Sequence, residues 1–255
     1  MKKQVLMPLV ALTALILVSL ACGTPSTPPP APTQPPPPTQ IPVQVQPTEV
    51  PPTEPPTAAP TEAPAAPDYF TEEFDGDISN WTYFISKNDS KADDSGSKHV
   101  TDNGFLVFDI AKNLNVYAVY QPYNYKNVQL DVRVDNRGTN NNNINLVCRL
   151  SDEGWYEVSI ANNGLYWIWA YDGTKNSYAQ LANGGSNKIR SGKETNEYTL
   201  ICKDRIIKLL INGVETRAFT DNQYVFKDGQ IGIGLSSFDD TPTKVEYDWV
   251  KISEP

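Results

Sequence analysis

The hydrophobic pattern of residues 145–171 is the one on which the rest of the chain is organised. Apolar and polar residues alternate on both sides of the Asn162-Asn163-Gly164 turn. Alternation with a period of two across a glycine-containing turn predicts two antiparallel strands joined as a hairpin. The same pattern recurs towards the C-terminus, and no segment has the 3.6-residue period of a long helix. We therefore expect an all-β domain.

Short alternating runs separated by Gly, Asn and Asp turns predict about ten strands. The expected strands are 104–110, 116–120, 128–134, 144–150, 155–160, 165–171, 197–203, 206–211, 230–236 and 245–252. An Asn- and Asp-rich loop is expected between Trp81 and Val100. This number of strands with closely spaced turns predicts a two-sheet antiparallel β-sandwich of the jelly-roll type.

Proline is concentrated in one part of the chain and marks its domain organisation. Of the 22 prolines, 18 fall between Pro25 and Pro67. A Pro/Thr/Ala/Gln tract buries too little apolar surface to offset the entropy of ordering, so we expect it to be unfolded and extended. We divide the chain into a targeting segment at 1–22, a disordered Pro/Thr-rich linker at 23–67 and a β-sandwich domain at 68–255.

The first 22 residues have the features of an export signal. Lys2 and Lys3 precede an apolar run, 5–21, that is too short for a stable membrane span. The run ends in Leu-Ala-Cys-Gly at 20–23, which resembles the lipobox of bacterial lipoproteins. The resemblance implies lipidation at Cys22 and a membrane-anchored protein on the extracytoplasmic face or cell surface. The alternative, an ordinary secretory signal, also predicts export.

The charge of the domain excludes one class of partner. The chain carries a formal net charge of −9. Two lysines of the leader and three glutamates of the linker together contribute −1, so residues 68–255 carry −8. Nucleic-acid binding requires clustered Lys and Arg, because the phosphate backbone repels an acidic surface. We expect no nucleic-acid partner, and a monomer.

Several motifs of the domain, taken in order, resemble the laminin-G and concanavalin A-like jelly rolls. These are the opening Phe70 and Phe74 before Asp-Gly and Trp81, the alternation at 156–168, and the closing strand 245–250. The resemblance covers roughly 70–252 and extends to lectins, glucanases and 3-keto-disaccharide hydrolase-like domains. It implies two curved sheets whose concave face binds or cleaves glycans.

Two cysteines remain in the domain after the leader. Cys148 and Cys202 each alternate with apolar residues, so both side chains are expected to face the core. Since an exported chain meets an oxidising environment, we predict a structural disulfide between them. Two separate buried thiols are the alternative.

The number of residues in the hairpin loop decides where the tryptophans lie. A three-residue loop at 162–164 pairs Ile160 with Tyr166 on the apolar face. The opposite face then carries Trp155, Glu157, Ser159, Trp167 and Trp169. A two-residue loop at 163–164 turns one strand over and sends Trp167 and Trp169 into the core.

The three-residue register favours a binding surface. Glu157 and Ser159 are polar, so we expect this face to be half-exposed to water. Aromatic rings beside a carboxylate on a wet face suit the C–H-rich faces and hydroxyls of sugars. We predict that a glycan or polysaccharide contacts Trp155, Glu157, Trp167, Trp169, Asn145 and Arg149. The alternative is that the rings form core or support a loop.

The resemblance also implies a possible metal site. Many jelly rolls of this type use a calcium ion to tie the N-terminal acidic segment to the last strand. Carboxylate oxygens are the ligands that Ca²⁺ prefers. The candidate ligands are Glu73, Asp75 and Asp77 on one side and Asp248 on the other. A solvated acidic turn is the alternative.

Most sequence motifs of enzymes are absent from the chain. His99 is the only histidine, and no zinc-ligand spacing, nucleophile elbow or phosphate loop occurs. Glucanases of the resembled fold carry E-x-D-x-E on one strand. The nearest segment here is Glu246-Tyr247-Asp248, with Val250 in place of the third acid. We favour a surface-anchored, non-catalytic carbohydrate-binding module; the alternatives are a glycoside hydrolase and a structural or protein-contact envelope or adhesin module.

Overall fold

A computed structural model describes residues 66–255, which form fifteen β-strands. Within that part of the chain no helix is long and apolar enough to cross a membrane. The targeting segment, the lipidation site at Cys22 and nearly all of the proline-rich linker lie outside the described residues.

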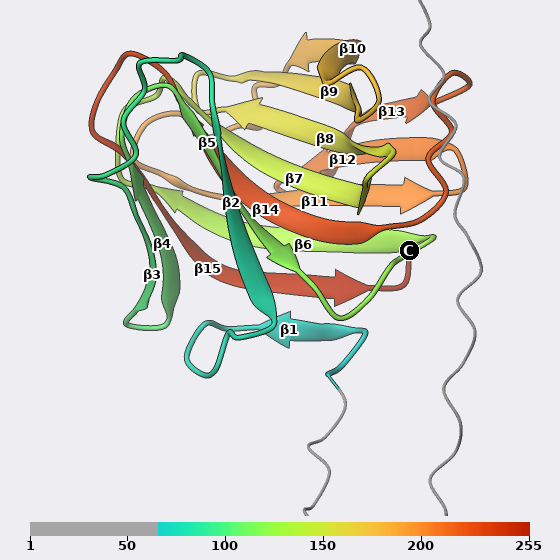
Figure 1. The fold of residues 1–255 in the computed structure, drawn as a ribbon, viewed down its shortest axis with the longest axis horizontal. Helices are drawn as coiled ribbons and strands as arrows, with labels where there is room; N and C mark the ends of the chain where they lie inside the picture. The colour runs from blue at the N-terminus through green and yellow to red at the C-terminus, as the bar shows by residue number, and fades with distance from the viewer. Residues whose placement is uncertain (1–65) are drawn as a thin grey trace, which may run out of the picture. The chain divides into compact units, whose positions relative to one another are not determined.

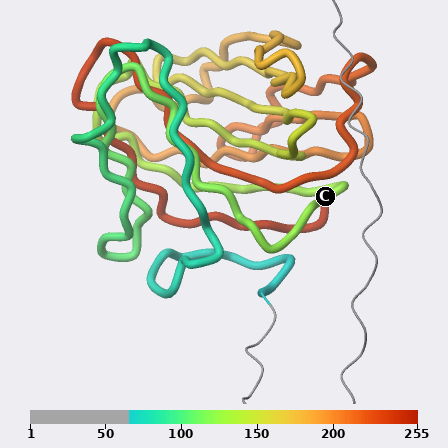
Figure 2. The backbone as a smooth tube through the Cα atoms, in the orientation of Figure 1, coloured from blue at the N-terminus to red at the C-terminus, as the bar shows by residue number. Residues whose placement is uncertain are grey.

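The strands form two antiparallel sheets that pack face to face (Figure 1). The eight-stranded sheet has the order β13 (Val214–Thr220), β12 (Ile206–Ile211), β11 (Thr195–Lys203), β6 (Val128–Asn136), β15 (Thr243–Ser253), β4 (Phe105–Ile110) and β3 (Lys98–Asp102), with β1 (Phe70–Glu72) paired to β15. The seven-stranded sheet has the order β10 (Ser177–Gly185), β9 (Leu165–Asp172), β8 (Gly154–Ala161), β7 (Asn142–Ser151), β14 (Gln230–Ser237), β5 (Leu114–Tyr120) and β2 (Trp81–Lys87). Figure 2 follows the chain as it crosses between the sheets, for example from β6 to β7. The predicted all-β, two-sheet jelly-roll sandwich is confirmed.

All ten predicted strands are present, and the five that the pattern missed lie at sheet edges. These are β1, β2, β3, β10 and β13. The expected loop between Trp81 and Val100 was wrong at both ends, since β2 begins at Trp81 and β3 includes Val100. An edge strand pairs on one side only and buries fewer side chains, so its alternation is weak. The exposed residues of β3 and β13 illustrate this.

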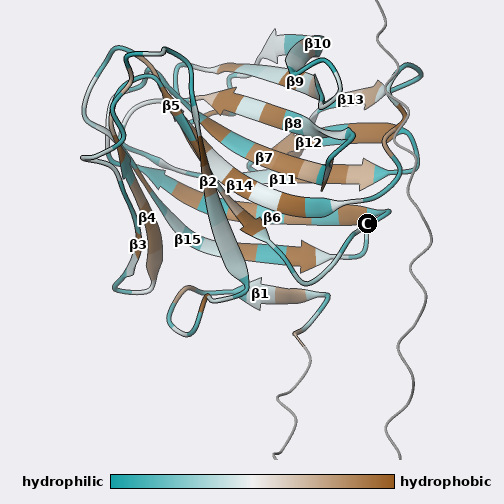
Figure 3. Ribbon diagram, in the orientation of Figure 1, coloured by the Kyte–Doolittle hydropathy of each residue, from teal (hydrophilic) through white to brown (hydrophobic). Residues whose placement is uncertain are grey.

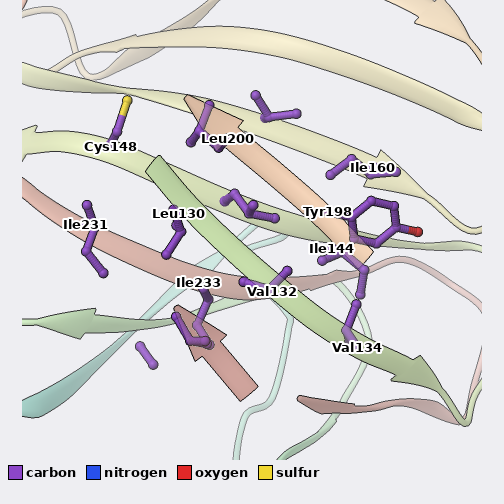
Figure 4. Close-up of a cluster of buried hydrophobic side chains, with 14 of the residues drawn as sticks. Leu130, Val132, Val134, Ile144, Cys148, Ile160, Tyr198, Leu200, Ile231 and Ile233 are labelled. Atoms are coloured by element: carbon purple, nitrogen blue, oxygen red, sulfur yellow. The ribbon is translucent and has the colours of Figure 1, made fainter. Parts of the chain in front are cut away.

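Alternating side chains build one core between the sheets. Figure 3 shows the hydrophobic bands recurring along the central strands. Figure 4 shows the resulting cluster, to which β6 contributes Leu130, Val132 and Val134. From the seven-stranded sheet, Ile144 and Ile233 lie in the same cluster and are almost completely buried. Burying apolar surface at about 25 cal/mol per Å² is the main force that holds the sheets together.

The disulfide joins the two sheets across this core. Cys148 on β7 is bonded to Cys202 on β11, and both side chains are fully buried. The predicted pairing is confirmed. The two bonded cysteines are separated by 54 positions in sequence.

The hairpin of β8 and β9 has the register of the three-residue loop. Ile160 pairs with Tyr166, and Val158 pairs with Ile168. All four of these side chains are buried in the core. The alternating positions therefore lie on the outer face of the seven-stranded sheet.

Candidate functional site

The outer face of the seven-stranded sheet carries the candidate site. On β8 the residues Trp155, Glu157 and Ser159 point away from the core, because Tyr156 and Val158 between them are buried in it. Trp167 and Trp169 lie opposite them on β9. The prediction that the hairpin tryptophans share a face with Glu157 is therefore correct.

A cavity of about 330 Å³ opens on this face. We call it the outer-face cavity; its lining consists of Asn88, Asn115, Tyr117, Asn143, Glu157, Ser159, Trp169, Tyr178, Ser236 and Phe238. These residues come from β5, β7, β8, β9, β10 and β14 and from the segments that follow β2 and β14. The lining combines aromatic rings, amides and hydroxyls with a single carboxyl group and no Lys or Arg. Such a surface suits an uncharged, hydroxyl-rich ligand better than an anion.

Glu157 is the centre of the hydrogen bonds in the outer-face cavity. Tyr117 Oη and Tyr178 Oη donate to its Oε2 over 3.0 and 3.1 Å. Trp155 Nε1 donates to the same oxygen over 3.3 Å, and Ser159 Oγ donates to Oε1 over 2.9 Å. One carboxyl group thus positions side chains from β5, β8 and β10.

The expectation that Glu157 and Ser159 are solvated was wrong. Glu157 is 4% exposed and Ser159 is 3% exposed. The large rings around them, not the polarity of their own strand, determine their access to water. Burial raises the pKa of the Glu157 carboxyl, and the hydrogen bonds from its four donors offset only part of that rise.

Burial also raises the pKa of both tyrosines that contact Glu157. Their hydroxyls are thus held in the protonated form and act as hydrogen-bond donors. Tyr117 stacks on Phe84 of β2, with ring centroids 4.7 Å apart. Tyr178 lies almost perpendicular to Trp169, with centroids 6.3 Å apart and an interplanar angle of 78°. The walls of the outer-face cavity are therefore aromatic groups packed against one another.

The three tryptophans of the hairpin have different roles. Trp169 lines the outer-face cavity. Trp155 stacks on Tyr171, with centroids 3.9 Å apart, and its Nε1 donates a hydrogen bond to Glu157. Trp167 pairs with Ser159 and Asn183 and is not among the residues that line the cavity. Only Trp169 and Glu157 of the predicted contact residues lie at the cavity surface.

Asn145 and Arg149, predicted as polar neighbours of the tryptophans, have other environments. Asn145 is fully buried on β7, between β8 and β14, and its Nδ2 donates to Ser236 Oγ over 2.7 Å. It therefore holds the side chain of a lining residue in place without lining the cavity itself. The prediction that Arg149 lies beside the tryptophans was wrong. The pairing of β7 with β8 shifts register after Cys148, so Arg149 does not continue the alternation of the outer face. Its guanidinium bonds to the carbonyl oxygens of Lys126 and Phe226.

The predicted calcium ligands do not form a cluster. Strand β1 does pair with β15, as that prediction requires. However, among residues 66–255 no group of three acidic, His or Cys side chains is placed to hold a metal ion. Asp248 instead pairs with Arg133 over 3.2 Å, and Asp77 accepts hydrogen bonds from Ser79. A calcium site built from Glu73, Asp75, Asp77 and Asp248 is thus not supported.

Several lining residues were not found from the sequence. Tyr117 lies in a continuous apolar run, 116–120, where alternation does not distinguish the two faces. Tyr178 belongs to β10, one of the missed edge strands. Asn143 and Ser236 lie opposite each other on β7 and β14, and their alternation on the outer face was the one available signal.

A comparison with family models places most of the chain in one family of domains. The model of the 3-keto-alpha-glucoside-1,2-lyase-like domain matches residues 69–253. A comparison with curated proteins gave no match.

Solved structures with the same fold include proteins with enzymatic and unassigned functions. A beta-glucanase of Bacillus licheniformis is 13% identical, with a TM-score of 0.55 over 74% of this chain and 99% of that chain. A Bacillus subtilis protein of unknown function with a galectin-like fold is 10% identical, with a TM-score of 0.56 over 72% and 94%. A Bacteroides ovatus GH16 protein of a mixed-linkage glucan locus, in complex with a G4G4G3G product, is 13% identical, with a TM-score of 0.55 over 72% and 99%. At these identities the likeness shows a shared concanavalin A-like fold and nothing further.

Proposed function

The chain belongs to the family of 3-keto-alpha-glucoside-1,2-lyase-like domains, and we propose that it binds a neutral saccharide, without cleaving it, in the outer-face cavity, which we call the saccharide cavity from here on. The observation that carries this proposal is the composition of the lining. Trp169 and Tyr178 offer ring surfaces for the C–H-rich side of a sugar, while the amides and hydroxyls around them suit its hydroxyl groups.

The size and charge of the saccharide cavity narrow the ligand class. Its volume of about 330 Å³ is at the lower end of the range for small-molecule pockets, about 300–1,000 Å³. A short segment or an end of a glycan chain fits such a volume better than an extended polymer. With Glu157 as the one ionisable carboxyl group and no cation in the lining, an acidic sugar would lack a counter-charge.

The same lining supports binding over hydrolysis. Both retaining and inverting glycosidases use two carboxyl groups, about 5–10 Å apart, on either side of the scissile bond. The lining of the saccharide cavity includes Glu157 alone.

One observation favours a catalytic alternative. Glu157 is a buried carboxyl group in a cavity, and its raised pKa is typical of a general acid. If the protein is a hydrolase, Glu157→Gln should abolish the formation of reducing sugar while leaving glycan affinity nearly unchanged. The binding proposal expects no release of reducing sugar by the parent protein.

The test of binding is a glycan screen followed by titration calorimetry with the best neutral oligosaccharide. We expect Trp169→Ala to weaken binding by at least about tenfold, since burial of a large apolar side chain contributes about 1.5–3 kcal/mol. Trp249→Ala is the matched control, because Trp249 is a half-buried tryptophan on β15 of the other sheet. Absence of any glycan ligand, or equal affinity in Trp169→Ala and the parent, would overturn the proposal.

We also propose that the protein displays this domain from a membrane through a lipid on Cys22. The support is the export signal with its lipobox-like end and the proline-rich linker that follows it. Cys22→Ser should remove acyl-chain labelling and move the protein from the membrane fraction to the soluble exported fraction. Persistent membrane association of Cys22→Ser would contradict it.

A further inference from the structure

Arg149 is a buried cation near the C-terminal end of β7. It is 2% exposed, and its backbone has a positive φ of 56°. It lines a second cavity that shares no residue with the saccharide cavity, although Glu157 of the saccharide cavity pairs with Val147, two residues before Arg149. A ligand in the second cavity is therefore distinct from a saccharide bound beside Trp169.

The guanidinium of Arg149 is only partly satisfied by its hydrogen bonds. Nε and Nη2 donate to Lys126 O over 3.1 and 2.9 Å, and Nη1 donates to Phe226 O over 2.8 Å. A guanidinium has five N–H donors, so one N–H on each terminal nitrogen remains without a protein acceptor. Two unused N–H donors on a guanidinium can bind the oxygens of a carboxylate or phosphate group.

The charge of Arg149 has no close counter-ion in the protein. Within residues 66–255, no carboxylate lies within 4.0 Å of its guanidinium. Asp204, Asp221 and Asp228 act on it from longer range. Asp221 is itself occupied, since it accepts hydrogen bonds from Tyr156 Oη and from three backbone N–H groups. Burying a cation without a close anion is costly unless a ligand supplies one.

Arg149 lines a cavity with a local excess of positive charge. The cavity has a volume of about 470 Å³ and is lined by Lys126, Arg149, Asp204, Arg205, Val225, Phe226, Lys227 and Asp228. Four of these side chains are cationic and two are acidic, in a domain whose net charge is −8. Within the described part of the chain, Lys126, Arg205 and Lys227 also form no ion pair.

The loop that forms one wall is held in a strained conformation. Val225 has a φ of 53°, which a β-branched residue rarely adopts. Its N–H donates to Asp221 Oδ2 over 2.7 Å, which holds the turn in place. Backbone strain of this kind costs about 1–3 kcal/mol and is concentrated at ligand sites.

We propose that this second cavity binds an oxyanion, a carboxylate or phosphate group carried by a larger ligand. The two remaining N–H groups of Arg149 bind the anion directly. Lys126, Arg205 and Lys227 surround it with positive charge and attract it from solution.

The test is titration calorimetry of the full chain with inorganic phosphate and, separately, with sodium glucuronate at constant ionic strength. We expect at least one anion to bind and the affinity to fall as salt is added. The double variant Arg205→Ala/Lys227→Ala changes only exposed side chains, so its fold should be retained. It should weaken binding by at least about tenfold. Lys98→Ala/Lys251→Ala, which removes the same charge from exposed sites on β3 and β15 that do not line this cavity, is the matched control.

Two further variants separate this site from the saccharide cavity and from general charge effects. Trp169→Ala should leave anion binding unchanged, whether or not it alters glycan binding. Arg149→Lys keeps the charge but loses the planar fork, and it should weaken binding as the double variant does. Preference for phosphate or for glucuronate identifies the source of the oxyanion. Absence of binding by both anions, or equal affinity in the double variant and the parent, overturns the proposal.

Discussion

The hydroxyl of Tyr178 donates a hydrogen bond to Oε2 of Glu157 over 3.1 Å. The two residues lie on β10 and β8, which are separated in the sheet by β9. The contact therefore reaches across an intervening strand and brings the edge strand into the wall of the saccharide cavity. It also explains how a carboxyl group on the outer face of a sheet comes to be buried.

Glu157 should stabilise the folded protein mainly as an acceptor. Glu157→Leu removes the acceptor of four donors, and we expect the free energy of unfolding to fall by about 3 kcal/mol. Glu157→Gln retains one oxygen and should cost about 1 kcal/mol. Urea unfolding of the three proteins measures both differences. Equal losses in the two variants would show that the hydrogen bonds contribute little.

The raised pKa of Glu157 predicts how stability depends on pH. The folded protein holds this proton more tightly than the unfolded chain, in which the carboxyl has a pKa of about 4.5. As pH rises from that value through the higher pKa of the folded state, the contribution of Glu157 to stability falls. The stability of the parent relative to Glu157→Gln should therefore decrease as pH rises above about 4.5. If this relative stability instead increases with pH, the hydrogen bonds to the ionised Glu157 carboxylate lower its pKa by more than burial raises it.

Gly234 should link the packing of the sheet to the shape of the saccharide cavity. A Cβ at this position would lie 2.6 Å from Val116 O and 2.8 Å from a ring carbon of Tyr117. Gly234→Ala should reduce the free energy of unfolding by about 1–3 kcal/mol, because backbone or ring must move. Since Tyr117 lines the cavity, glycan affinity should fall as well.

The control for this substitution is Gly76→Ala, whose added Cβ meets no atom within 4 Å. It should change stability by no more than about 0.5 kcal/mol. Chemical denaturation and calorimetry measure the two effects. A Gly234→Ala variant as stable as Gly76→Ala would show that Tyr117 moves freely.

The disulfide should be a large contributor to stability. Cys148 and Cys202 close a loop with a sequence separation of 54. By the loop-entropy model its loss should reduce the free energy of unfolding by about 4 kcal/mol. Denaturation of the parent with and without reductant measures this value. The Cys148→Ala/Cys202→Ala variant should be insensitive to reductant; equal stability of the oxidised and reduced parent would contradict the prediction.

The pattern of residues was sufficient to predict the central strands and the disulfide. For the hairpin it left two possible registers, which place the tryptophans on different faces. Alternation is a local property of most of the doubly paired strands, because burial on the core side requires an apolar residue at every second position. For this reason the ten central strands could be predicted, whereas the edge strands could not. Cys148 and Cys202 were found in the same way, from their positions in two alternating runs.

The hairpin register that occurs, and the side chains that meet on the outer face, follow from the tertiary structure. The saccharide cavity combines Tyr117, Glu157 and Ser236, which come from strands far apart in sequence. Glu157 looked solvated on its own strand and is buried because rings from β5 and β10 cover it. Arg149 looked like a neighbour of the tryptophans and lies elsewhere because one register shift in β7 displaces it. Burial and access depend on what neighbouring strands place above a residue, and the pattern of a single strand does not contain that information.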